Sequence, residues 1–289
     1  RPGVQSLKSV FKILAYALGI MVSLWAVTVF YLSNANPDIT WDWDSINTSD
    51  IHFPSSFAWG TATAAHQVEG NNSNNNWYQW EKAVDENGIS RIHNNDSSAM
   101  AADHWNRYPE DILLMKDLGV NHYRFSIEWS RIEPQKGYYD LESLSHYRKM
   151  CLAMIKAGIT PVVTLHHFTH PIWFEEKGGF LNHENTHYWV DYCTRVFTTL
   201  SDRVTNWCTV NEPEVFAIMG YHMKLFPPGK GSIPKTIQVM QNVIKAHVAV
   251  YHSLKSIRPD SRVGLAKNIT IFDPLRRWNL LHWLTAFIL

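Results

Sequence analysis

Short apolar segments alternate with amphipathic segments of helical spacing through most of the chain. Five apolar runs have the length of strands: 57–62, 120–127, 160–165, 204–210 and 262–266. In the segments between them, such as 189–200, apolar residues recur at intervals of three and four. Strands that alternate with helices form parallel sheets, and nearly continuous apolar strands are buried on both faces. The pattern therefore predicts an α/β fold built on a parallel sheet.

An open doubly wound sheet and a closed barrel both fit this alternation. No Gly-x-Gly-x-x-Gly or Gly-Lys-Ser/Thr follows the first strand, which argues against a nucleotide-binding open sheet. Polar and aromatic residues follow successive strands: His66 and Gln67, Arg124 and Glu128, His166 and His167, and Asn211 and Glu212. Sites on a barrel are assembled from the carboxyl ends of many strands. We therefore expect a (β/α)8 TIM barrel, of which the chain holds roughly the first five units.

Glu212 stands where an apolar strand stops in Asn211-Glu212-Pro213, because proline cannot continue a hydrogen-bonded ladder. Taken alone, a strand-end glutamate is more often a loop cap or a surface ion pair. Arg124 lies inside an apolar strand, so its guanidinium needs a negative partner. His166 and His167 alone fit a partly buried pair, since a zinc site needs three or four converging ligands. We expect no metal and no organic cofactor.

Four motifs in a fixed order are more specific than any of these residues alone. They are 57–70 (FAWGTATAAHQVEG), 123–134 (YRFSIEWSRIEP), 164–171 (TLHHFTHP) and 209–213 (TVNEP). Together they resemble glycoside hydrolase family 1, which contains retaining β-glucosidases and β-galactosidases on a (β/α)8 barrel. The resemblance runs from about Phe53 to the end of the chain.

The resemblance implies a role for five residues. Glu212 matches the general acid/base, and Asn211 matches the residue that binds the sugar 2-hydroxyl. Gln67 and His167 match the glutamine and histidine that bind the glycone. Arg124 matches the arginine that orients the nucleophile. The implied ligand is a β-linked glycoside or oligosaccharide.

Two residues depart from the family pattern. Phe168 replaces the usual tryptophan after the histidine, and His66 replaces the usual tyrosine before the glutamine. The family usually has His-Trp at this place, so Phe168 aligns with the tryptophan and His167, rather than His166, with the glycone-binding histidine. Both leave the glycone preference open.

A retaining glycosidase needs a second carboxylate about 5 to 5.5 Å from the first, and the family carries it in Glu-Asn-Gly on a late strand. Glu86-Asn87-Gly88 has these letters, but it precedes the second strand and lies in a polar stretch, which predicts a surface turn. The nucleophile is therefore expected beyond Leu289. We expect hydrolysis by double displacement in a longer parent protein and none from this chain. The alternative is a non-catalytic glycan-binding or receptor-like relative.

The segment from Ile13 to Leu32 has no charged residue and is long enough to cross a membrane. A signal peptide is the rival, but its apolar core is usually about 7 to 15 residues long. Basic residues precede the segment and acidic residues follow it, which predicts a cytoplasmic N-terminus and a barrel on the other side. The expected parts are a cytoplasmic tail, a transmembrane helix, a linker and the incomplete barrel domain, over 1–12, 13–32, 33–52 and 53–289.

Composition bears on the partners. The formal net charge is zero and no long basic run occurs, so a nucleic-acid partner has no electrostatic support. Thirteen tryptophans fit a carbohydrate ligand, because aromatic faces stack on the C–H faces of sugars. Ordinary core packing remains the simpler role for any one of them.

Overall fold

The computed structural model describes residues 2–38 and 42–288 of the chain and separates them into two compact units. One unit is Ser55–Asn268. The other joins the N-terminal segment up to Pro54 with the segment from Ile269 onward. The compact unit Ser55–Asn268 lies within the predicted barrel domain at 53–289, whose boundaries stay a prediction.

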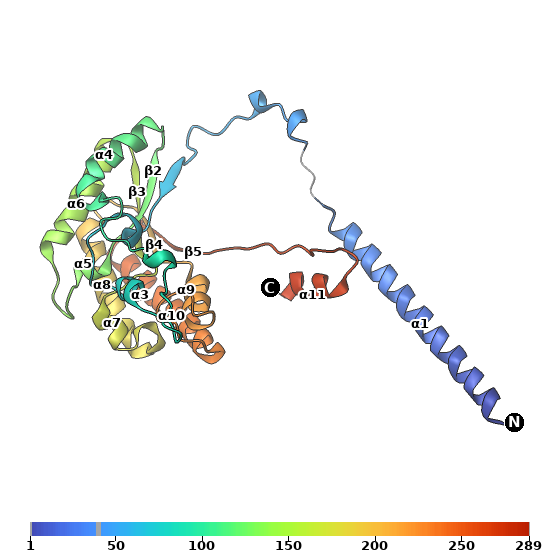
Figure 1. Cartoon of the computed structure of the whole chain (residues 1–289). Coiled ribbons are helices and arrows are strands. Elements are labelled where there is room, and N and C mark those ends of the chain that lie inside the picture. The colour runs from blue at the N-terminus through green and yellow to red at the C-terminus, as the bar shows by residue number, and fades with distance from the viewer. Residues whose placement is uncertain (1, 39–41, 289) are drawn as a thin grey trace. The chain divides into compact units, whose positions relative to one another are not determined.

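The larger unit is built on one five-stranded sheet whose neighbouring strands are all parallel (Figure 1). The strands follow the chain in the order β1 to β5, and they are β1 Gly60–Ala62, β2 His122–Ser126, β3 Thr160–His166, β4 Asn206–Asn211 and β5 Arg262–Ala266. All five coincide with a predicted apolar run. Within the described residues β1 and β5 each pair with one neighbour, so the sheet is an open part of a barrel.

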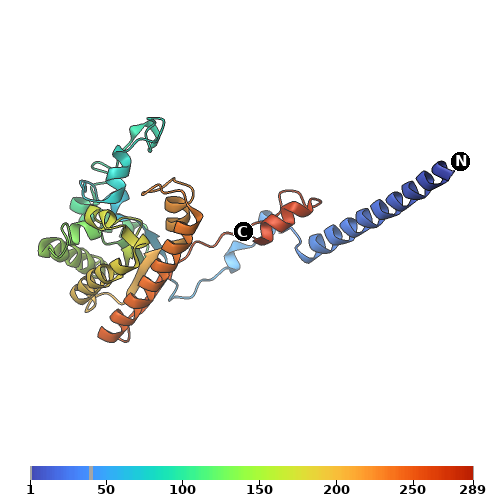
Figure 2. The same cartoon turned by 90° about the horizontal axis from the view of Figure 1, so that it is seen from below.

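Four long helices connect the strands and pack in sequence order: α4 His104–Asp117, α6 Leu141–Lys156, α8 Thr186–Leu200 and α10 Ile233–Ile257. Figure 2 shows the long α10 at the side of this unit. The turns after α4 and α6 contain Gly119 and Gly158 at φ +82° and +83°, a conformation that costs glycine little. These turns bring the chain back to the amino ends of β2 and β3.

Short helices follow the carboxyl ends of the strands. They are α2 Ala65–Val68, α3 Asn76–Lys82, α5 Trp129–Ile132, α7 Ile172–Glu176 and α9 Pro213–Tyr221. Single 3-10 turns are η3 His93–Asn95, η4 Gly179–Leu181 and η5 His183–Asn185. This end of the sheet therefore carries most of the irregular backbone.

A fully buried aromatic cluster supports the carboxyl ends of β2 and β3. Trp129 stacks on Tyr192 at 4.8 Å between ring centroids and packs against Phe174 at 4.6 Å. The Tyr192 hydroxyl donates to the carbonyls of Ile127 and Leu165, which follow β2 and lie in β3. Truncating such a core side chain typically costs about 3–5 kcal/mol. The cluster therefore stabilises the positions of both strand ends relative to α8.

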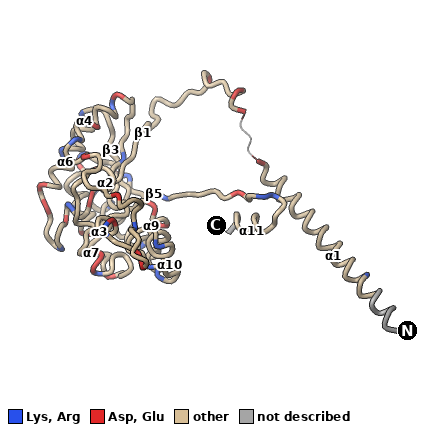
Figure 3. The backbone as a smooth tube through the Cα atoms, viewed as in Figure 1, with Lys and Arg blue, Asp and Glu red and all other residues tan. Residues whose placement is uncertain are grey.

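The second unit contains a long N-terminal helix, α1 Pro2–Ala35, and a short helix, α11 Leu280–Ile288. Within α1, Ser9–Ala35 is long and apolar enough to cross a membrane. Lys12 is its single charged residue, and Figure 3 shows most of the helix without charge. A signal sequence has the same properties. The orientation across a membrane stays a prediction.

The helix is longer than the expected span at 13–32, because it continues through the predicted tail and into the predicted linker. The rest of that linker holds two 3-10 turns, η1 Trp43–Ser45 and η2 Thr48–Asp50. Positions 39–41 of the linker lie outside the described residues.

Candidate active site

Four of the five predicted site residues lie at or after the carboxyl end of a strand, and the fifth, Arg124, lies in the middle of β2. Gln67 lies in α2 after β1, Arg124 in β2 and His167 directly after β3. Asn211 is the last residue of β4, and Glu212 follows it. Because the strands are parallel, their carboxyl ends meet at one edge, where barrels carry their sites.

Arg124 and Asn211 are in direct contact. Nη2 of Arg124 donates a hydrogen bond of 2.5 Å to Oδ1 of Asn211, and Nε donates one of 2.9 Å to Oγ1 of Thr164. Three adjacent strands, β2, β3 and β4, are thereby joined above the sheet. Since the Asn211 oxygen is an acceptor here, its Nδ2 group remains a donor.

The expected negative partner of Arg124 is absent from residues 2–38 and 42–288, where no carboxylate lies within ion-pair distance of it. Its other neighbour is Sγ of Cys208, 3.9 Å from Nη2. Burial raises the pKa of the Cys208 thiol, so this group is not the missing anion. The guanidinium keeps donor groups that the described chain does not use.

His167 and His166 point to different environments. His167 lines a cavity together with Gln67. Burial and then the charge of Arg124 lower its pKa to about 4, so the ring is neutral at pH 7. His166 is fully buried against Phe180, and its Nε2 lies 3.4 Å from Nδ1 of His170. His167 therefore faces the cavity, whereas His166 belongs to the buried aromatic core.

Glu212 begins α9 with a left-handed backbone, at φ +45° and ψ +64°. This conformation is uncommon outside glycine and costs on the order of 1–3 kcal/mol. The Glu212 N–H donates to the carbonyl of Ala266 at 2.6 Å, and Pro213 supplies the first turn of the helix. The Glu212 carboxylate is partly exposed and makes no hydrogen bond within the part of the chain that the structure describes.

The cavity beside Gln67 and His167 has a volume of about 410 Å³, which is within the range of small-molecule sites. Its aromatic lining is Trp77, Phe168 and Phe226. The ring centroids of Trp77 and Phe226 are 4.9 Å apart, and those of Phe168 and Phe226 are 5.5 Å apart. Apolar faces and hydrogen-bonding groups in one cavity suit a sugar ring.

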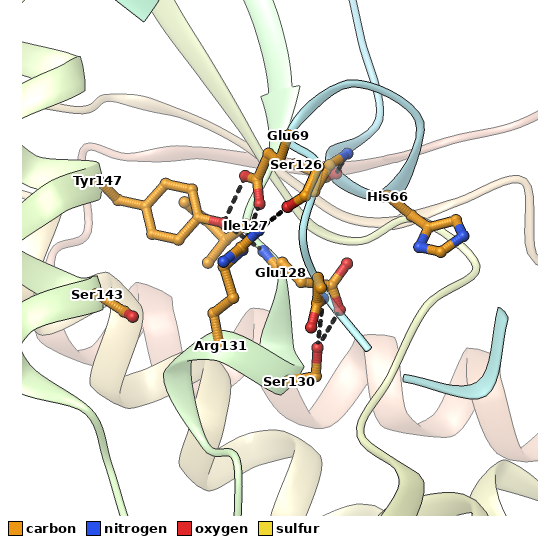
Figure 4. Close-up of polar contacts among 12 residues, drawn as sticks. His66, Glu69, Ser126, Ile127, Glu128, Ser130, Arg131, Ser143 and Tyr147 are labelled. Atoms are coloured by element: carbon orange, nitrogen blue, oxygen red, sulfur yellow. Dashed lines mark hydrogen bonds and ion pairs between the residues drawn. The ribbon is translucent and has the colours of Figure 1, made fainter. Parts of the chain in front are cut away.

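A buried polar network lies next to the site and was not predicted (Figure 4). Nε of Arg131 donates to Glu69 at 2.8 Å, and the Tyr147 hydroxyl donates to the same carboxyl at 2.6 Å. The backbone N–H of Glu128 donates to the Tyr147 hydroxyl at 3.0 Å. Burial raises the pKa of Glu69 to about 7, against the opposing effect of Arg131. The network connects the loops after β1 and β2 to α6.

Glu128 extends this network to the loop after β3. Its carboxylate accepts from the hydroxyls of Ser130 and Thr169, each at 2.8 Å, and its side chain is fully buried. The available sequence signal was an acidic residue inside the apolar segment Ile127–Glu128–Trp129. Such a residue must be buried with partners, as Arg124 was expected to be.

Glu86 lies in a turn, which confirms the sequence interpretation. The backbone N–H groups of Asn87 and Ile89 donate to Oδ1 of Asp85, and Glu86 is exposed. Within the described ranges, no three His, Cys, Asp or Glu side chains are grouped so that they could hold a metal ion.

Parallel β/α units with polar side chains at the carboxyl ends of the strands define a TIM-barrel protein with its site at that end. The chain belongs to glycosyl hydrolase family 1, whose family model matches residues 49–280. This match confirms the resemblance seen in the four motifs.

The most similar proteins include several beta-glucosidases. The chain is 34% identical over 230 residues to beta-glucosidase A of Acetivibrio thermocellus and 35% identical over 221 residues to the cytosolic beta-glucosidase of Homo sapiens. These matches cover 78% and 74% of this chain, but 51% and 46% of the two relatives. The chain thus spans about half the length of the curated relatives that it matches.

Solved structures give the same result. The beta-glucosidase from Thermotoga maritima in complex with cyclophellitol superposes with a TM-score of 0.74 at 33% identity, and the beta-glycosidase from Pyrococcus horikoshii with 0.69 at 41%. Each match covers 78% of this chain, and 51% and 50% of the respective structures. The five parallel strands are therefore about half of a TIM barrel.

Proposed function

We propose that the parent protein is a retaining β-glycosidase of the β-glucosidase type, acting on β-linked glycosides or oligosaccharides. The observation that carries the proposal is the contact of Arg124 with Asn211 directly before Glu212, at the carboxyl edge of the sheet. The beta-glucosidases at 34% and 35% identity support a β-glucoside as substrate.

In this proposal Glu212 is the general acid/base. A nucleophilic carboxylate attacks the anomeric carbon while Glu212 protonates the departing glycosidic oxygen, which releases the aglycone. Glu212, now ionised, takes a proton from water, and the resulting hydroxide displaces the nucleophile from the anomeric carbon. The partly exposed position of Glu212 and its lack of a described hydrogen-bond partner suit a group that exchanges protons with ligand and water.

The nucleophile is assigned to sequence beyond Leu289. Arg124 would orient it and hold it ionised, which gives a role to the donor groups that the described chain leaves unused. Without a second carboxylate the glycosyl-enzyme cannot form, so we propose that this chain alone does not hydrolyse glycosides.

The remaining residues bind the sugar. Nδ2 of Asn211 would donate to the 2-hydroxyl, a contact that strengthens as positive charge develops on the ring. Gln67 and the neutral ring of His167 would bind hydroxyls of the glycone, since each offers both donor and acceptor atoms. Their common cavity is consistent with this division of roles.

The test uses the full-length protein and an aryl β-glucoside. We expect turnover by the wild type and a loss of at least about a hundredfold in Glu212→Gln, the size of a general acid/base contribution. Added azide should restore part of the variant's turnover as a glycosyl azide, because an anionic nucleophile needs no general base. Glu86→Gln, at an exposed glutamate, is the matched control and should behave as wild type.

The second candidate is a glycan-binding relative without chemistry. It is favoured by one observation, that no described carboxylate faces Arg124. A full-length protein that binds β-glycosides but does not turn them over would establish this candidate and refute the first. An active protein whose Glu212→Gln variant retains full activity would refute the assignment of Glu212.

For the N-terminal part we propose a single membrane span within α1, with the N-terminus cytoplasmic and the barrel unit on the opposite side. The apolar length of Ser9–Ala35 supports the span. The orientation rests on the charge difference between its two ends.

A further inference from the structure

The cavity that contains Gln67 and His167 has a further polar pair on its wall, His66 and Glu81. Nε2 of His66 lies 2.8 Å from Oε1 of Glu81, and the two side chains are 9% and 7% exposed. A carboxylate buried to this extent requires hydrogen-bond donors around it. The number of donors present decides whether it has capacity left for a ligand.

The hydrogen bonds of Asn75 establish which way the His66 ring donates. Oδ1 of Asn75 accepts from the backbone N–H of Tyr78 at 2.8 Å, as the cap of α3, so the amide orientation is fixed. Its Nδ2 group therefore donates to Nδ1 of His66, 3.1 Å away. Since Nδ1 accepts, Nε2 carries the proton and donates to Glu81. Both ring nitrogens of His66 are occupied, so His66 itself is not available to a ligand.

Glu81 keeps acceptor capacity. Oε1 accepts from His66 and from the backbone N–H of Ser98 at 3.1 Å, and Oε2 accepts only from the Ser98 hydroxyl at 3.3 Å. A carboxylate has about four acceptor positions, so one position on Oε2 is free. Because Glu81 lines the cavity, a ligand there is the group that could fill it.

The rest of the cavity indicates what kind of ligand this is. Trp77, Phe168 and Phe226 offer aromatic faces, whereas Gln67, His167 and Glu81 offer polar atoms. A pyranose has apolar C–H faces and a rim of hydroxyls, and its hydroxyls bind carboxylates through strong charge-assisted hydrogen bonds. A purely apolar ligand would leave the free acceptor of Glu81 unsatisfied.

We propose that Glu81 is a specificity-determining residue, which accepts a hydrogen bond from one hydroxyl of the sugar bound beside Gln67 and His167. His66 is a positioning residue that holds the Glu81 carboxylate through its Nε2–H group. The inference rests on the proposed function, because it assigns the substrate preference of that same site. The hydrogen bond to a charged acceptor favours the hydroxylated sugar by about 10- to 100-fold.

The experiment measures kcat and KM of the full-length protein on an aryl β-glucoside and on its 3-, 4- and 6-deoxy analogues. Glu81→Gln retains the shape of the side chain and an oxygen for His66, but removes the charge. We expect kcat/KM of Glu81→Gln to fall about 10- to 100-fold on the glucoside and to change little on one of the three analogues. His66→Ala should produce the same selectivity to a smaller degree.

If Glu81→Gln lost the same factor in kcat/KM on all four substrates, its role would be merely structural and the proposal would be overturned. The proposal would also be overturned if the ratio of kcat/KM on the glucoside to kcat/KM on each analogue stayed as in the wild type. Glu86→Gln, in the exposed turn, is the control and should leave every ratio as in the wild type. If Glu81→Gln does not fold, Glu81→Asp keeps the charge but withdraws it by one methylene and should show the same selective loss. Equal losses in Glu81→Asp would overturn the proposal.

Failure of the proposed function is recognised separately, by a wild-type protein that turns over none of the four substrates. The same comparison is then made by calorimetric binding of methyl β-glucoside and its deoxy analogues. A selective loss of affinity in Glu81→Gln supports the role of Glu81 without catalysis. An unselective loss, or no binding by the wild type, overturns it.

Discussion

Nη2 of Arg124 lies 2.5 Å from Oδ1 of Asn211, so a residue in β2 fixes the side-chain amide of the last residue in β4. The amide cannot rotate without losing this charge-assisted hydrogen bond. Its Nδ2 group is therefore held as a donor, on the residue that directly precedes Glu212. This relationship gives the first prediction.

Asn211→Asp preserves the acceptor for Arg124 and replaces the Nδ2 donor by an oxygen. In the full-length protein we expect kcat/KM on an aryl β-glucoside to fall about 10²- to 10³-fold, as for loss of a donor that acts in the transition state. The loss should be much smaller on the 2-deoxy glucoside, which has no hydroxyl at that position. Asn206→Asp makes the same change at the opposite end of β4 and should have little effect. Equal losses on both substrates would contradict the assigned contact.

His167 predicts a specific pH dependence of stability. Its pKa is about 4 in the folded protein and 6.5 ordinarily, so between these values the unfolded chain binds the proton and the folded chain does not. The free energy of unfolding contributed by His167 is therefore present above pH 6.5 and is lost as the pH falls toward 4. His166, whose pKa burial also lowers, acts in the same direction.

The measurement is urea unfolding at pH 7 and pH 5. His167→Gln should lose less stability between these values than the wild type, by at most about 2 kcal/mol. His252→Gln, at an exposed histidine of α10, should keep the wild-type difference. If the free energy of unfolding of His167→Gln fell as much between pH 7 and pH 5 as that of the wild type, the prediction would be wrong.

Tyr147→Phe should destabilise the protein through two buried partners. The Tyr147 hydroxyl donates to Glu69 and accepts from the Glu128 N–H, and its loss leaves both groups without that bond. We expect a fall of about 1–3 kcal/mol in the free energy of unfolding, measured in urea. Tyr138→Phe, at an exposed tyrosine, should change it by less than about 0.5 kcal/mol. If Tyr147→Phe and Tyr138→Phe changed the free energy of unfolding equally, the Tyr147 hydrogen bonds would contribute nothing to stability.

Membrane association should depend on the apolar character of α1. Lysines in place of Leu18 and Val22 should move the protein from the membrane pellet to the soluble fraction after alkaline extraction, because each charge costs about 2.5–3.5 kcal/mol at a helix centre. Lysines in place of Leu113 and Leu118, which are exposed in and just after α4, are the control. This control variant should remain in the membrane pellet. The mass of the mature chain separates an anchor, which is retained, from a cleaved signal sequence.

The sequence was most informative where periodicity and motif letters agreed. The apolar run 160–165 predicted β3 almost to its ends, because a strand buried on both faces has a continuous apolar sequence. At the site, the sequence placed Gln67 after the first strand and Asn211 at the end of the fourth, and the carboxyl ends of parallel strands meet at one edge of the sheet.

Contacts between distant side chains were not predictable in the same way. Nothing in the letters around Glu81 indicated that the His66 ring would donate to it, since that depends on how Asn75 caps α3. The partners of Glu69 come from α5 and α6, whose distance depends on packing. The carboxylate expected opposite Arg124 was inferred from a general rule on buried charge, and within the described residues neutral groups lie there.

The hydrogen bond from the Glu212 N–H to the carbonyl of Ala266 has a consequence for engineering. It makes the final residue of β5 a backbone support for a glutamate far earlier in the chain, in a conformation that costs free energy to hold. A variant shortened to end just before Ala266 would lose this backbone acceptor. Any shortened variant meant to present Glu212 must therefore retain β5 through Ala266.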